Sequence, residues 1–161
     1  MIERTLEDDW QLWRDARLEG LRLHPEAFGS SFEEEKDLSE DYWRQGLRQV
    51  TALAFRENKS IAGIAVLAQE AAIKRRHRAN LFSMYVRPDA RGRGIGDALV
   101  KAVVDQARGR VLQIHCSVIV SNDRARQLYE RHGFLVYGTE LRALRVGELF
   151  HDEYLMCCKL E

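Results

Sequence analysis

Apolar residues recur along this chain with two different periods, which divide it into helix-like and strand-like segments. Spacings of three and four place apolar side chains on one helix face and predict helices over residues 10–23, 40–49, 95–107 and 122–132. Alternating or nearly continuous apolar runs predict strands over residues 2–6, 50–56, 60–72, 81–86, 111–120, 134–145 and 148–160. This order of elements predicts one α/β (α+β) domain over residues 1–161, with a mixed central sheet of about seven strands and helices on both faces.

Individual residues mark the ends of several elements. Ser39 is a suitable N-cap for the helix over 40–49, and Pro25 ends the helix before it. Gly133 follows the last helix at the position where a left-handed residue commonly ends one. Trp10 and Trp13 lie on the apolar face of the first helix, so we expect them to pack in the core.

A glycine-rich loop between a strand and a helix carries the most specific signal in the chain. The strand over 81–86 is stopped by Pro88, which has no amide hydrogen to donate to a sheet. Glycines then occupy alternate positions of the loop, in the order Arg91, Gly92, Arg93, Gly94, Ile95, Gly96. Such a loop directs backbone amides at one point near the positive end of a helix dipole. The expected ligand is therefore a phosphate or pyrophosphate.

Two known phosphate-binding loops do not match this pattern. A P-loop requires lysine and then serine or threonine after its last glycine, where this chain has Asp97. The dinucleotide fingerprint requires a glycine three places after Gly94, which again is Asp97. Residues 91–96, after Met84-Tyr85-Val86, instead resemble the acetyl-coenzyme A pyrophosphate loop of the GCN5-related N-acetyltransferases (GNAT), which reads Gln or Arg, two residues, Gly, one residue, Gly or Ala.

A second motif lies about one strand further along the chain. Asn122 can cap the helix that follows it, and Tyr129 is two helical turns away on the same face. With Ala125 between them and Gly133-Phe134 after them, these residues resemble the last motif of the same family. The resemblance implies that the asparagine bonds the pantetheine arm and that the tyrosine hydroxyl lies beside the thioester sulfur.

The resemblance also implies the arrangement of the coenzyme site. In this family the sheet is mostly antiparallel, and the strands on either side of the glycine-loop helix splay apart around the pantetheine. Carried over by position, the coenzyme-binding residues are Met84, Tyr85 and Val86 through their backbone, Arg91, Gly92, Arg93, Gly94, Ile95 and Gly96 at the pyrophosphate, and Asn122 and Ala125 on the later helix.

The implied activity is transfer of an acetyl group from acetyl-CoA, a co-substrate, to a primary amine by direct attack, with no metal. Tyr129 is the implied catalytic residue. A thiol with a pKa of about 8.5 is a stronger acid than tyrosine, whose pKa is about 10. Proton transfer from the Tyr129 hydroxyl to the leaving thiolate would therefore be unfavourable at equilibrium, and the hydroxyl would instead stabilise the thiolate. The alternative is a non-catalytic coenzyme A sensor or scaffold, which a structure without an open channel beside Tyr129 would favour.

The acceptor amine is less clearly encoded. In the resembled family the segment between the first two helices often forms a wall of the acceptor site, which points to Glu33, Glu34 and Glu35 as substrate-binding residues. Glu70 and His115 are further candidates for a general base, and a chain of waters could replace them all. Small amines, amino compounds, antibiotics, peptide N-termini and lysine side chains all stay open as acceptors, as does a bulkier acyl donor.

The composition of the chain bears on its binding partners and on the compartment in which it works. Lysine plus arginine and aspartate plus glutamate both number 25, so no global field attracts nucleic acid or an anionic membrane, although residues 74–78 are basic. Three cysteines without metal-ligand spacing indicate a reducing cytoplasm. No apolar run approaches the ~20 residues that span a bilayer, and the acidic N-terminus does not resemble a signal peptide. Dimers are common in the resembled family, so a homodimer stays open.

Overall fold

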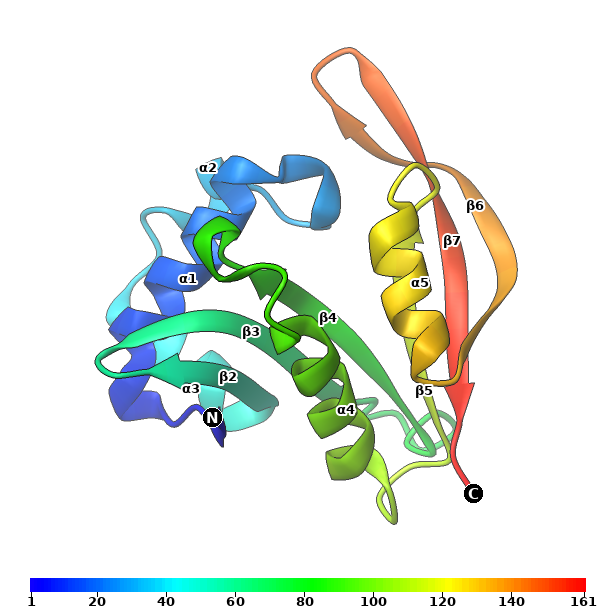
Figure 1. Cartoon of the computed structure of the whole chain (residues 1–161), viewed down its shortest axis with the longest axis horizontal. Helices are drawn as coiled ribbons and strands as arrows, with labels where there is room; N and C mark the ends of the chain where they lie inside the picture. Colours follow the sequence, from blue (N-terminus) through cyan, green and yellow to red (C-terminus); the bar gives the residue numbers. More distant parts are fainter.

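The computed structural model describes residues 1–161 and contains one sheet of seven strands in the order β1-β2-β3-β4-β5-β7-β6 (Figure 1). All neighbouring strands are antiparallel except β4 and β5, which are parallel. This confirms the predicted mixed sheet. The strands are β1 (Ile2–Arg4), β2 (Thr51–Glu57), β3 (Ser60–Gln69), β4 (Arg78–Val86), β5 (Gln113–Ile119), β6 (Phe134–Val146) and β7 (Leu149–Lys159).

The helices cover both faces of the sheet, as predicted. They are α1 (Trp10–Leu23), α2 (Phe32–Glu35), α3 (Glu40–Gln49), α4 (Ile95–Ala107) and α5 (Asp123–Arg131). Trp13 of α1 and Trp43 of α3 pack against β2 and β3 in one apolar cluster, whereas residues of α4 and α5 join the other cluster. Ile64 of β3 belongs to the first cluster and Ala65 to the second, so this strand is buried on both faces. None of the helices is long and apolar enough to cross a membrane.

The sheet opens between its two parallel strands. Pairing between β4 and β5 is limited to Arg78–Gln113, Ala79–Ile114 and Asn80–His115. Beyond Asn80 the two strands diverge, with α4 and α5 on the same side of the sheet at either edge of the opening (Figure 1). The backbone edge of β4 after Asn80 therefore has no strand partner on the side that faces β5.

A bulge lies in β4 beside this opening. The register between β3 and β4 shifts between Ile64 and Val66, and Ser83 has a φ of 54°. A left-handed φ is uncommon for a residue other than glycine. Ser83 is buried, and its hydroxyl accepts a hydrogen bond from the guanidinium of Arg17 on α1. The contact ties α1 to the strand at the point where the sheet splits.

The observed elements differ from the predicted ones in a few places. No helix was predicted between those over 10–23 and 40–49, yet the segment between them contains α2. A capping box starts this helix, with the Ser31 hydroxyl bonded to the Glu34 amide and the Glu34 carboxylate bonded back to Ser31. The strand predicted to reach residue 72 ends at Gln69, and β4 begins at Arg78. The strands predicted over 134–145 and 148–160 are present as β6 and β7, which form a hairpin that projects from the body of the domain (Figure 1).

Candidate active site

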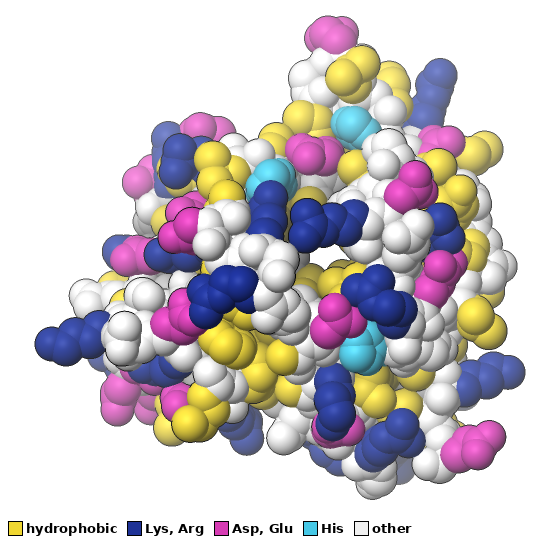
Figure 2. All heavy atoms as spheres, in the orientation of Figure 1, with side chains coloured by type: hydrophobic (Ala, Val, Ile, Leu, Met, Phe, Trp, Pro, Cys, Tyr) yellow, Lys and Arg dark blue, Asp and Glu magenta, His cyan; other side chains and the backbone are white.

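A cavity of about 670 Å³ lies between the glycine loop, the end of β4 and the start of α5. Figure 2 shows a hollow on this face with Lys and Arg side chains around it, and the arginines that line the cavity are Arg91, Arg124 and Arg131. Its volume is typical of a small-molecule site. The predicted coenzyme-binding residues all line it except Arg93, namely Met84, Tyr85, Val86, Arg91, Gly92, Gly94, Ile95, Gly96, Asn122 and Ala125.

The glycine loop presents free backbone donors to this cavity. Gly92 and Gly94 have φ values of 77° and 75°, a region that favours glycine. Gly94 is the N-cap of α4 and has no side chain to bond the first amides of the helix. The amides of Gly92, Gly94, Ile95 and Gly96 have no hydrogen-bond partner within the chain. Free amides at the positive end of a helix dipole fit the pyrophosphate that the sequence predicts.

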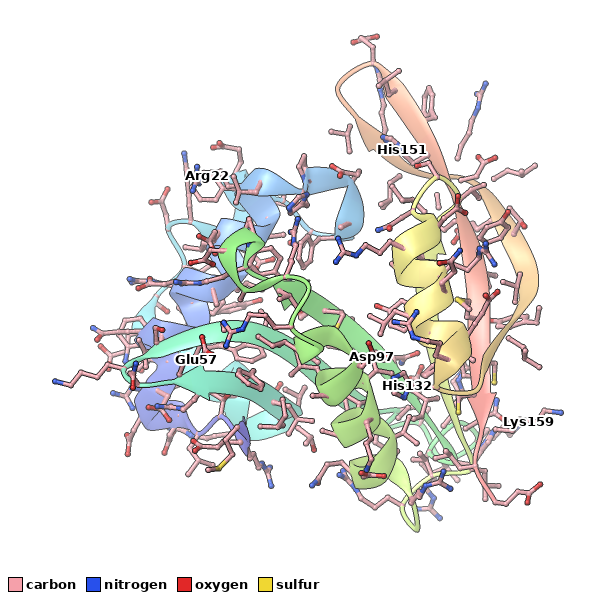
Figure 3. The ribbon with its side chains drawn as sticks, viewed as in Figure 1. Arg22, Glu57, Asp97, His132, His151 and Lys159 are labelled. Carbon is pink, nitrogen blue, oxygen red and sulfur yellow. The ribbon has the colours of Figure 1, made fainter.

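The two loop arginines have different roles in the structure. Arg91 lines the cavity, donates to the Val86 carbonyl at 3.1 Å and lies 2.8 Å from the His24 ring nitrogen. Arg93 instead donates two hydrogen bonds to Glu57 at the end of β2. Glu57 is labelled in Figure 3. These bonds hold the pKa of Glu57 below its usual value. The expectation that both arginines add charge at the pyrophosphate therefore applies, in this structure, to Arg91 alone.

An ion cluster between α4 and α5 was not foreseen from the sequence. Asp97, in the first turn of α4, accepts hydrogen bonds from Arg131 at 3.1 and 3.2 Å and lies 3.0 Å from the His132 ring nitrogen. Figure 3 shows Asp97 and His132 facing each other across the gap between the helices. The bonds from Arg131 keep the pKa of Asp97 low. Because Asp97 also lines the cavity, this pairing offsets a negative charge that would otherwise repel a phosphate.

Asn122 caps α5 and Tyr129 lies on this helix, as predicted. The Asn122 side-chain oxygen accepts from the Ala125 amide at 3.1 Å, which confirms the N-cap. Its side-chain NH₂ has no partner within the chain, so that group is free to contact a ligand. Tyr129 is 6% exposed, its ring packs against Phe134, and its hydroxyl has no partner within the chain. Burial raises the pKa of Tyr129 well above its ordinary value.

A second cavity, of about 360 Å³, adjoins the first beneath the β4 bulge. Ala27, Phe28 and Met84 line both cavities, so the two share a wall. The Tyr129 side chain lines the second cavity and not the first. The remaining residues of the second cavity are Arg17, Gly29, Ser30, Leu81, Phe82, Ser83, Ser117 and Glu153. The combined space can hold a long ligand with its phosphates at the glycine loop and its reactive end near Tyr129.

The three glutamates predicted at the acceptor site are engaged elsewhere. Glu33 pairs with Lys36 at 2.7 Å, and Glu34 belongs to the capping box of α2. Glu35 is buried and forms a two-bonded ion pair with Arg17 at 2.8 and 3.1 Å. Burial raises the pKa of Glu35, but the bonds from Arg17 and Ser30 outweigh it and the net shift is downward. None of the three lines either cavity, so their role toward an acceptor stays a prediction.

The other two general-base candidates also lie outside the cavities. Glu70 accepts a hydrogen bond from Asn80 at 3.1 Å. His115 lies within 2.7 Å of the Gln113 amide nitrogen and 3.3 Å of the Tyr137 hydroxyl. Burial, with the nearby charge of Arg78, lowers the pKa of His115. Sequence reasoning did not single out Glu153, the carboxylate that does line the second cavity, because it belongs to no motif.

Comparisons with known proteins agree with this geometry. The model of the acetyltransferase (GNAT) family matches residues 10–134, whereas no curated protein matches the sequence. A GNAT acetyltransferase from Streptococcus pneumoniae superposes with a TM-score of 0.88 at 22% identity, over 100% of this chain and 99% of that one. YncA, a putative acetyltransferase from Salmonella typhimurium solved with acetyl-CoA, gives 0.87 at 18% identity, over 100% and 94%.

A phosphinothricin acetyltransferase from Sinorhizobium meliloti, in complex with acetyl-CoA, superposes with a TM-score of 0.81 at 21% identity, over 99% of this chain and 88% of that one. At these identities the solved structures establish the fold, and the family model covers most of the chain. Together with the free amides of the glycine loop and the opening between β4 and β5, they show that the chain belongs to the GNAT acetyltransferase family.

Proposed function

We propose that the chain is an N-acetyltransferase that moves the acetyl group of acetyl-CoA to a primary amine by direct attack. One observation supports this proposal above the others. Two adjoining cavities place unbonded amides of the glycine loop at one end and the unpartnered Tyr129 hydroxyl at the other. A binding site needs the first feature, and a transfer reaction makes use of the second.

The residues of the larger cavity fit the phosphates and the arm of coenzyme A. The amides of Gly94 and Gly96 and the guanidinium of Arg91 would contact the pyrophosphate. The free side-chain NH₂ of Asn122 and the unpaired edge of β4 would bond the amides of the pantetheine. When bound, acetyl-CoA supplies an acetyl group activated as a thioester.

Tyr129 would act on the leaving sulfur as a hydrogen-bond donor. Its pKa is raised by burial, so the hydroxyl keeps its proton more firmly than a free tyrosine. A coenzyme A thiol, with a pKa of about 8.5, is the stronger acid of the two. Tyr129 therefore stabilises the thiolate by a charge-assisted hydrogen bond and does not need to give up its proton.

A thiol-release assay with acetyl-CoA and a broad panel of amines tests the proposal. We expect release of coenzyme A that depends on the amine and is accompanied by an acetylated product of the matching mass. The rival function is a coenzyme A sensor or scaffold without catalysis. Tight binding of acetyl-CoA in calorimetry with no acetylated product from any acceptor would favour this rival. The cavity beside Tyr129 argues for the enzyme, because a sensor has no need of that space.

A further inference from the structure

The second cavity carries one uncompensated charge. Its lining contains two charged side chains, Arg17 and Glu153. Arg17 donates two hydrogen bonds to Glu35, which neutralises its charge, and a third hydrogen bond to the Ser83 hydroxyl. Glu153 has no ion-pair partner in the chain. A half-buried carboxylate without a positively charged partner is costly, and such groups cluster at functional sites. The cavity is therefore negative overall and suits a cation.

The position of Glu153 relative to Tyr129 follows from the sheet. Glu153 lies on β7 opposite Ile119 of β5 and Glu140 of β6. Tyr129 lies on α5 and belongs to the apolar cluster that α4 and α5 share. The side chains of Tyr129 and Glu153 both line the second cavity. Burial raises the pKa of Glu153, and the nearby charge of Glu140 raises it further. A hydrogen bond with Ser117 acts in the opposite direction, and the net shift is upward. The carboxylate is thus a better proton acceptor than an ordinary surface glutamate.

We propose that Glu153 holds the acceptor amine as an ammonium ion and takes the proton that its nitrogen loses on acetylation, so the acceptor is a small cationic amine without a carboxylate. This inference rests on the proposed N-acetyltransferase function. The Arg17 guanidinium is bound to Glu35, which leaves no uncompensated cation in the cavity for an acceptor carboxylate. Phe28, Leu81 and Phe82 also line the cavity and can contact the apolar part of a small amine, beside the hydroxyls of Ser30, Ser83 and Ser117.

The protons and electrons of this step balance. The ammonium ion first loses one proton to solvent, because only the neutral amine can attack. The nitrogen lone pair then forms the bond to the acetyl carbon, and the electron pair of the carbon–sulfur bond leaves with the sulfur. The second proton of the nitrogen passes to the Glu153 carboxylate, which releases it to water. Tyr129 donates its hydrogen bond to the thiolate and keeps its own proton.

Pairs of acceptors that differ by one carboxylate test the substrate class. Phenethylamine is phenylalanine without its carboxylate, and pentylamine is norleucine without its carboxylate. We expect the wild-type protein to acetylate each amine with a kcat/KM at least about tenfold above that of its amino acid, since an unpaired like charge in a cavity costs more than ~1.4 kcal/mol. The readout is thiol release, with the product confirmed by mass.

Variants of Glu153 test the residue. We expect Glu153→Gln to lower kcat/KM for phenethylamine by about 100-fold, as for loss of a positioned base, while acetyl-CoA affinity in calorimetry stays unchanged. Glu153→Asp should recover part of the activity. In the wild type, kcat/KM should rise with pH through the titration of Glu153, and this limb should disappear in Glu153→Gln. The matched control is Glu148→Gln, an exposed carboxylate in the β6–β7 turn that lines neither cavity; it should stay within about twofold of wild type.

The outcomes separate this inference from the function on which it rests. Faster acetylation of phenylalanine and norleucine, or of a peptide, would refute the substrate class and leave the N-acetyltransferase function intact. Wild-type activity in a folded Glu153→Gln protein would refute the role of the residue. If no amine of any kind is acetylated while acetyl-CoA still binds, the proposed function fails first.

Discussion

Replacing Tyr129 with phenylalanine should separate catalysis from stability. The Tyr129 hydroxyl has no hydrogen-bond partner in the chain, and the ring keeps its packing against Phe134 in the variant. The variant therefore loses no hydrogen bond of the folded protein, and we expect its free energy of unfolding to differ from that of the wild type by less than ~0.5 kcal/mol. A hydrogen bond to a charged group contributes about 1.5–3 kcal/mol, which corresponds to a turnover about 10- to 150-fold lower.

The assay is steady-state thiol release with the best amine of the panel, run beside calorimetry of acetyl-CoA and thermal unfolding. Tyr137→Phe is the matched control, because Tyr137 also carries a hydroxyl but lies exposed on β6, beside His115 and outside both cavities. It should turn over like the wild type. Unchanged turnover in Tyr129→Phe would refute the assignment of this hydroxyl to the sulfur. A large loss of stability would instead show that the hydroxyl has a structural partner.

Three further predictions follow from the loop and from the buried ion pair. Gly94→Asp should abolish acetyl-CoA binding in calorimetry, because it adds a negative charge and a strained left-handed residue where the phosphates would lie. Arg91→Ala should weaken that binding more than Arg93→Ala, since the Arg93 side chain is bonded to Glu57 outside the cavity. Glu35→Gln should lower the free energy of unfolding at pH 7 by about 3 kcal/mol, as measured in urea. In the wild type the pKa of Glu35 is lower in the folded state than in the unfolded state. The contribution of Glu35 to the free energy of unfolding is therefore complete above the unfolded pKa of 4.5 and is lost as the pH falls through the lower folded pKa. The variant should not show this loss of stability in acid.

The elements that the sequence predicted well depend on local chemistry. The helix over 40–49 and its Ser39 cap are as predicted, because periodicity and a capping side chain act within a few residues. The capping box of Ser31 and Glu34 was equally local and could have been recognised in the polar segment before Lys36. The three glutamates predicted at the acceptor site, Glu33 to Glu35, thus belong to a short helix.

The ion pairs of the site were beyond prediction, because they join segments that only the sheet brings together. Arg93 is 36 residues from Glu57, and Arg131 is 34 residues from Asp97. Whether a loop arginine faces a phosphate or a nearby carboxylate depends on where the β2–β3 hairpin ends beside the loop. Spacing along the chain contains no information on that distance.

The two cavities therefore differ in how the sequence encodes them. The amides that would hold the pyrophosphate come from one continuous stretch whose backbone requires glycine at Gly92 and Gly94, so the requirement is visible as a motif. The second cavity is instead built from separate parts of the chain: β4 and the segment over 27–30 contribute four residues each, and α1, β5, α5 and β7 contribute one each. Glu153 lies 24 positions after Tyr129 and reaches the same cavity only through the pairing of β5 with β7. Arg17, Ser117 and Glu153 line the second cavity and not the first, so changes at these residues alter it without touching the glycine loop.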